Sequence, residues 1–71
     1  MTIKDNVRDC FNDIMAMIKE TRKHQIQYEV DSELFEELRI MLERVGYMVG
    51  ISKSRQANNM LIYEIKVKWG G

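Results

Sequence analysis

The 71-residue chain has no proline, a single cysteine (Cys10), a single histidine (His24) and no long apolar run. A lone cysteine excludes a scaffold stapled by internal disulfide bonds. Without a cluster of Cys and His, the sequence offers no zinc site. No stretch approaches the roughly 20 apolar residues that a helix needs to cross a bilayer. We therefore expect no metal, no cofactor and no membrane partner.

The first residues of the chain indicate its cellular compartment, and its net charge indicates its class of partner. The chain becomes charged at Lys4 and Asp5 with no apolar run after them, so we expect no signal peptide and a soluble, reduced, cytoplasmic protein. Formal net charge is zero. Residues 1–46 carry seven Lys and Arg against ten Asp and Glu, and residues 47–71 carry four against one. Overall neutrality argues against nucleic acid as a partner, because nucleic-acid-binding domains are basic.

The clearest pattern runs from Met60 to Trp69, where apolar and polar side chains alternate. A period of two predicts a strand with one buried and one exposed face. The predicted buried face comprises Leu61, Tyr63, Ile65, Val67 and Trp69, and the predicted exposed face comprises Ile62, Glu64, Lys66 and Lys68. Since this strand is the longest and most apolar, we expect it at the centre of the sheet.

Two helices are predicted upstream. Apolar residues recur every three to four positions over residues 3–23, with Thr2 as the expected N-cap. A second helix is predicted over residues 32–45, with Asp31 as its N-cap and Gly46 as the left-handed residue that ends it.

The remaining segments predict strands at residues 25–30 and 47–52, the latter joined to the strand 60–69 by a polar loop. The order is α-β-α-β-β. This is a single domain over residues 1–71, a two-layer α+β fold with a three-stranded mixed sheet and both helices packed on one face. A right-handed strand–helix–strand unit makes the first two strands parallel, and we expect the strand order 1-3-2.

Four cations form the predicted ligand or partner surface: Lys53, Arg55, Lys66 and Lys68. Such a group can hold a phosphate, a nucleotide or an acidic protein patch. The alternative is a solvated sheet face on which lysines discourage pairing between sheet edges. No glycine-rich phosphate loop accompanies these cations.

Catalytic and metal-binding groups are not predicted. Cys10 lies on the apolar stripe of the first helix and is interpreted as a buried side chain, and His24 is interpreted as a solvated cation at a helix end. Asp5, Asp9 and Asp13 line one side of that helix, either as a solvated face or as a binding surface for a basic partner. Because no nucleophile is paired with a base, we expect a protein that is not an enzyme.

Self-association is predicted from size and from the first helix. A domain this small buries only about 60% of the surface of its unfolded chain. A helix over residues 3–23 would be about 30 Å long, more than the remaining α/β body can cover. Its apolar stripe is the predicted oligomer interface, most simply of a homodimer: Ile3, Val7, Phe11, Ile14 and Ile18.

The chain resembles small accessory proteins encoded by tailed bacteriophages. In these a long N-terminal helix, a short strand and a helix ending Gly-Tyr-x-Val precede a hairpin that closes on Ile-x-Trp or a near equivalent. The matching residues here are Leu38, Leu42, Gly46-Tyr47-Met48-Val49, Tyr63, Ile65, Val67 and Trp69. The ending Ile-Lys-Val-Lys-Trp is two residues longer than that pattern, and the hairpin loop is more polar. The resemblance implies a phage origin and self-association; it transfers no activity and no functional residue.

Together these observations predict a non-enzymatic viral protein, in the cytoplasm of an infected bacterium, that binds a host or defence-system protein as a homo-oligomer. An anti-defence role follows from that reading. One alternative is a binder or sponge for a phosphate-bearing nucleotide. Another is a minor virion or assembly component.

Overall fold

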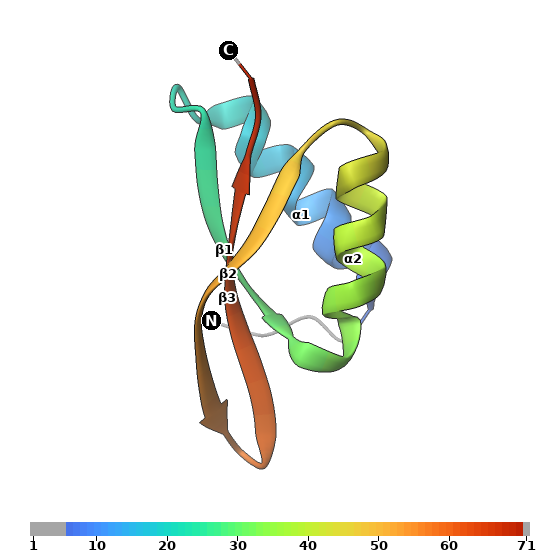
Figure 1. Cartoon of the computed structure of the whole chain (residues 1–71), viewed down its shortest axis with the longest axis vertical. Helices are drawn as coiled ribbons and strands as arrows, with labels where there is room; N and C mark the ends of the chain where they lie inside the picture. Colours follow the sequence, from blue (N-terminus) through green and yellow to red (C-terminus); the bar gives the residue numbers. More distant parts are fainter. Residues whose placement is uncertain (1–5, 71) are drawn as a thin grey trace.

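The computed structural model describes residues 6–70, which form two helices and three strands. In chain order these are α1 (Val7–Glu20), β1 (Gln25–Asp31), α2 (Ser32–Arg44), β2 (Met48–Ala57) and β3 (Met60–Lys68). Figure 1 shows both helices on the same side of the sheet. The predicted α+β class, the element order and the placement of the helices are confirmed.

Helix α1 is shorter than predicted. Asn6 has an extended backbone and caps the helix, its side-chain oxygen accepting a hydrogen bond from the Arg8 N–H at 2.8 Å. The other end closes at Thr21, which is also extended. The predicted N-cap Thr2 and the start at Ile3 lie outside the described residues. With 14 residues, α1 is about 21 Å long, and it packs against β1 and α2.

Helix α2 begins at the predicted residue, Ser32, and ends at Arg44, one residue before the predicted end. The Asp31 side chain accepts a hydrogen bond from the Glu33 N–H at 3.0 Å. At the other end Gly46 has φ +96°, and the Tyr47 N–H returns to the Leu42 carbonyl oxygen at 3.1 Å. A β-carbon on Gly46 would meet nothing within 4 Å, so glycine is favoured there by the backbone angle and not by space.

The sheet has the predicted strand order, β1-β3-β2. It is antiparallel at both pairings, so the prediction of a mixed sheet is not confirmed. β1 and β2 do run in the same direction, but β3 lies between them and opposes both. Once the strand of a hairpin is inserted between two strands of like direction, every neighbouring pair becomes antiparallel.

The β2–β3 hairpin is longer than predicted, and the predicted loop over residues 53–59 is wrong. β2 continues to Ala57, and only Asn58 and Asn59 form the turn, with φ of +52° and +61°. Positive φ at both central residues is the geometry of a type I′ turn, which asparagine tolerates. Figure 1 shows this end of the hairpin extending beyond the helices. Residues 51–56 are exposed, so this part of the strand carries the polar composition of a loop.

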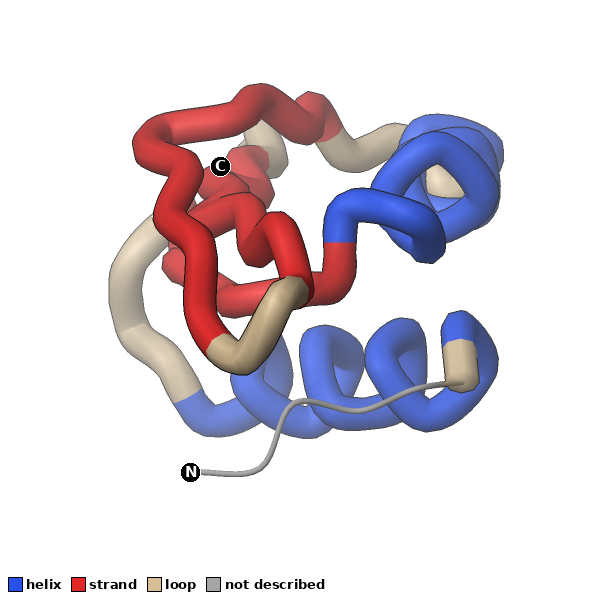
Figure 2. Tube along the Cα trace, turned by 90° about the horizontal axis from the view of Figure 1, so that it is seen from below, coloured by secondary structure: helices blue, strands red, loops and turns tan. Residues whose placement is uncertain are grey.

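The core lies between the helices and the sheet. α2 contacts all three strands, whereas α1 contacts β1 and α2; Figure 2, seen from the hairpin end, shows β2 on the side of the sheet away from α1. Trp69 faces the helix layer as predicted and packs edge-to-face on Tyr47, with ring centroids 5.8 Å apart. The largest fully buried side chains are Ile14, Leu38, Leu42, Ile65, Val30, Val67 and Cys10.

Neither helix within residues 6–70 has the length and apolar character needed to cross a membrane.

Candidate partner-binding face

The side chains that point away from the helices define what we call the open face. In an antiparallel pair, directly opposed residues share a face, so the strand register assigns its members. Across β1, β3 and β2 they form four rows: Gln25–Lys68–Met48, Gln27–Lys66–Gly50, Glu29–Glu64–Lys53 and Asp31–Ile62–Arg55.

The four predicted cations lie on this face, but they do not form one surface. Lys66 and Lys68 occupy two rows that contain no acid, and within residues 6–70 neither forms an ion pair. Lys53 and Arg55 occupy the two rows that contain acidic residues. Of the four cations, therefore, only Lys66 and Lys68 share no row with an acid, and both lie in one half of the open face.

Arg55 is committed to an internal partner. Its Nε and Nη2 atoms lie 2.9 and 2.8 Å from one carboxylate oxygen of Glu29 on β1. The hydrogen bond to Glu29 is the larger cause, and the negative charge of Glu29 the smaller one, of a pKa of Arg55 that is raised above its usual value. Because the guanidinium already has a carboxylate, Arg55 is a poor candidate for a ligand donor.

Ile62 lies beside the ion pair between Arg55 and Glu29, and its side chain is less exposed than predicted. It points to the open face as expected, yet it is only 3% exposed and lies apart from the core under the helices. Together with charged residues from all three strands, Ile62 lines a small hollow of about 120 Å³. Leu61, predicted to be buried, is 37% exposed, because the hairpin extends beyond the helices at that point.

A larger hollow lies at the other half of the open face. Its volume is about 280 Å³, and its lining residues are Met48, Val49, Gly50, Ile51, Ser52, Lys66 and Lys68. Met48 is 67% exposed. A β-carbon on Gly50 would meet nothing within 4 Å. Two flexible cations and an exposed thioether thus border a position without a side chain.

The sequence prediction missed Met48 and Gly50 as members of this site. Alternation along this strand puts Tyr47, Val49 and Ile51 together on one face, and the first two pack against the core. Ile51 is instead 49% exposed, next to a β-bulge at which the β2–β3 register shifts. The alternation itself was the available indication, since it places Met48 and Gly50 on the opposite face.

The stripe predicted as an oligomer interface is largely used within the chain. Ile14 is fully buried in the core, and Val7, Phe11 and Ile18 pack against that core as partly buried residues. Ile3 lies outside the described residues. Because the shorter α1 lies over β1 and α2, Ile14 is not available at a surface, and the predicted interface is wrong for that residue.

Two residues of α1 that were considered for a chemical role, Cys10 and Asp13, have structural roles instead. Cys10 is fully buried, as predicted. The Tyr28 hydroxyl on β1 donates a hydrogen bond to the Asp13 carboxylate at 2.9 Å. Burial, followed by this hydrogen bond, raises the pKa of Tyr28 well above its usual value. Asp13 therefore joins α1 to β1 and is not simply part of a solvated acidic row, whereas His24 is exposed as predicted.

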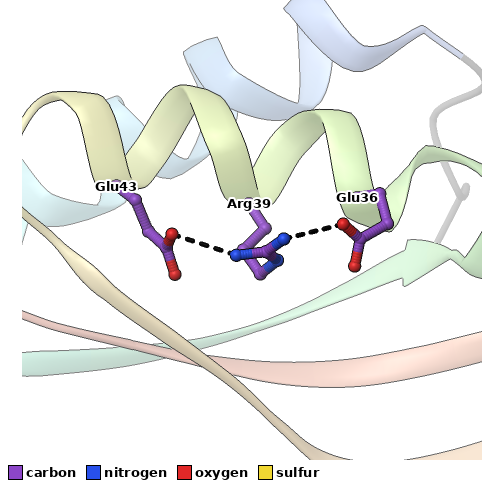
Figure 3. Close-up of polar contacts among 3 residues, drawn as sticks. All are labelled: Glu36, Arg39 and Glu43. Atoms are coloured by element: carbon purple, nitrogen blue, oxygen red, sulfur yellow. Dashed lines mark hydrogen bonds and ion pairs between the residues drawn. The ribbon is translucent and has the colours of Figure 1, made fainter.

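The outer surface of α2 carries a charge cluster that is satisfied along the helix. Arg39 Nη2 lies 2.7 Å from Glu36 Oε2, and Arg39 Nη1 lies 3.0 Å from Glu43 Oε1. Figure 3 shows Arg39 between the two carboxylates. The hydrogen bond from Arg39 lowers the pKa of Glu36. Spacings of three and four residues place these side chains side by side. The cluster keeps a net negative charge, so this helix surface and the lysine half of the open face differ in sign.

Within the described part of the chain, no three His, Cys, Asp or Glu side chains gather as a metal site would require. Comparison of the sequence and structure with protein-family models, with curated proteins and with solved structures found no match. The open face is therefore interpreted from its own geometry.

Proposed function

We propose that this chain is a non-enzymatic phage accessory protein that binds a host or defence-system protein in the cytoplasm of an infected bacterium. The observation that carries the proposal is the uncovered half of the open face, where Met48 stands exposed beside Lys66 and Lys68. The phage and host context comes from the resemblance of the sequence to tailed-phage accessory proteins.

The chemistry of this surface favours a protein partner. Methionine adapts its shape to irregular apolar contacts and is enriched at protein interfaces. The lysines supply a charge that attracts an acidic patch and sets the orientation of the encounter. Other polar candidates already have partners: Arg55 binds Glu29, and Asp13 accepts the hydrogen bond of Tyr28.

The experiment is affinity capture from a bacterial lysate with three baits. These are the wild-type chain, a variant with Lys66→Glu and Lys68→Glu, and a control with Lys19→Glu and Lys23→Glu. The control makes the same change in charge at exposed positions in and just after α1. We expect a partner that the wild type and the control retain and that the open-face variant loses.

Two results would contradict the proposal. One is a partner that all three baits retain equally; the other is a partner lost only with the control, which would place recognition on the helix side. Circular dichroism of each bait first establishes that the substitutions leave the fold intact.

A phosphate-bearing nucleotide is the second candidate ligand, favoured by the lysine pair that no acid balances. A ligand that binds only the folded state raises the melting temperature. A panel of nucleotides that leaves the melting temperature unchanged at millimolar concentration would exclude it.

A further inference from the structure

We infer that the hollow beside β2 receives an extended acidic segment of the partner protein, added as a fourth strand at the free edge of β2. This inference rests on the proposed function and specifies the partner chemistry. An acidic side chain of the added strand would lie over Gly50 and meet the ammonium group of Lys66.

The edge of β2 is open to such pairing. β2 pairs with β3 on one side only, since the strand order is β1-β3-β2. In an antiparallel pair every second residue directs its N–H and C=O groups away from the neighbour, so an edge strand presents unpaired groups. The hollow follows this edge, because residues 48–52 of β2 make up five of its seven lining residues. Strand addition takes its affinity from main-chain hydrogen bonds and its specificity from side-chain pockets.

Gly50 is the second observation. Glycine weakens the interior of a strand and often marks a position that a ligand or another backbone approaches closely. Nothing within the described chain accounts for it: a β-carbon there would meet no atom within 4 Å, and its φ lies outside the left-handed region. An added strand would place a side chain beside this position. The missing Gly50 side chain leaves that incoming group a path to Lys66, the residue directly opposite.

Charge selects an acidic segment and selects β2 over β1. In the first two rows of the open face, which contain no acid, Lys66 and Lys68 lie on the central strand, and the β2 edge beside them holds Gly50 and Met48. The other free edge, β1, presents Gln25, Gln27 and Glu29 on the same face. An acidic strand at β1 would lie beside neutral and like-charged side chains, whereas at β2 it would lie over the hollow that Lys66 and Lys68 line.

The same face lacks what a nucleotide base requires. All six aromatic residues of the chain belong to the core or pack against it from the helix side: Phe11, Tyr28, Phe35, Tyr47, Tyr63 and Trp69. None is left to stack on a base from the open face. A carboxylate-bearing peptide uses the lysines without needing such a ring.

The test is a titration of the isotope-labelled 71-residue chain by nuclear magnetic resonance. The probe is a short, end-capped peptide of alternating Glu and Thr; the controls are the same peptide with Gln for Glu, inorganic phosphate and ADP. We expect shifts of the amides of residues 48–52 and 66–68 with the Glu peptide only, and we expect added salt to reduce them. Shifts confined to β1, equal shifts with the Gln peptide, shifts with phosphate or ADP alone, or no shift at all would overturn the inference.

Gly50→Thr separates binding from folding. Threonine favours strands and has room at this position, so the variant should melt at a higher temperature while binding the Glu peptide at least about tenfold more weakly. Ser54→Thr is the matched control, because Ser54 lies on the same strand but faces the other way; it should bind like the wild type. A Gly50→Thr protein that binds as tightly as the wild type overturns the inference.

The two proposals fail separately. If lysate capture depends on Lys66 and Lys68 but the Glu peptide does not shift the β2 amides, strand addition is wrong and the protein-binding function stands. If the peptide binds at β2 but capture ignores the lysines, the proposed function is wrong.

Discussion

Arg55 on β2 reaches across the central strand to Glu29 on β1, and two of its nitrogen atoms lie within 2.9 Å of one carboxylate oxygen. This ion pair spans the open face next to the buried side chain of Ile62. It divides the face into a half whose cations are matched by acids and a half, around Gly50, where Lys66 and Lys68 are not. The division places the candidate binding surface at one end of the sheet.

The burial of Ile62 on a face that helices do not cover leads to a stability prediction. Ile62→Ala should lower the free energy of unfolding by about 2 kcal/mol, because a nearly enclosed side chain leaves a cavity. Leu61→Ala, one residue earlier and 37% exposed, should cost less than about 1 kcal/mol. Urea unfolding of both variants measures the difference. A larger loss for Leu61→Ala would mean that the strand faces are assigned the wrong way round.

The hydrogen bond from Tyr28 to Asp13 predicts a loss of stability at alkaline pH. The pKa of Tyr28 is raised in the folded state above its usual value near 10. The unfolded chain therefore releases the phenolic proton first, so the contribution is complete below pH about 10 and is lost as the pH rises further. Tyr28→Phe should cost about 1 kcal/mol at neutral pH and should flatten the alkaline decline.

Urea midpoints measured from neutral to alkaline pH, for the wild type and Tyr28→Phe, test this. Phenolate absorbance gives an independent measurement, since one of the three tyrosines should ionise only as the protein unfolds. Parallel stability curves for the two proteins would contradict the account.

The Asn58–Asn59 turn can be improved by one substitution. Both residues have positive φ, and glycine at the second position of a type I′ turn carries no β-carbon penalty. Asn59→Gly should raise the free energy of unfolding by about 0.5 kcal/mol, whereas Asn59→Ala should lower it. The same order in both thermal and urea unfolding is expected; a stabilising alanine would argue against this turn geometry.

Self-association stays a prediction, and the buried Ile14 changes how it is tested. A substitution in the α1 stripe would disturb the core, so a loss of assembly there would not identify an interface. Light scattering of the unmodified chain is the direct measurement, and the homodimer prediction requires a mass near twice 8.5 kDa. The mass of a single chain at high concentration would exclude self-association.

The sequence predicted the parts of the fold that depend on local patterns. The length and apolar character of β3 predicted its central position, and Asp31 and Gly46 marked the ends of α2 because caps have a local chemistry. The hairpin length was missed, since residues 53–57 pair with β3 beyond the helices and so lack the apolar face by which a strand is recognised. The start of α1 was missed because its apolar spacing continues upstream of the Asn6 cap.

The candidate site was predicted only where it depends on a local pattern in the sequence. Lys66 and Lys68 could be assigned to one face from alternation alone. The pairing of Arg55 with Glu29 could not, because it joins residues 26 positions apart across a third strand. The role of Gly50 depends on what surrounds it in space, which no local pattern reports.

The central claim is that the protein recognises its partner with the β2 side of the open face. Amide hydrogen exchange of the protein, alone and bound to the partner recovered by affinity capture, measures this directly. The account predicts added protection in residues 48–52 and 66–68, with α1 and α2 unchanged. Protection confined to the helices, with β2 exchanging as in the unbound chain, would contradict it.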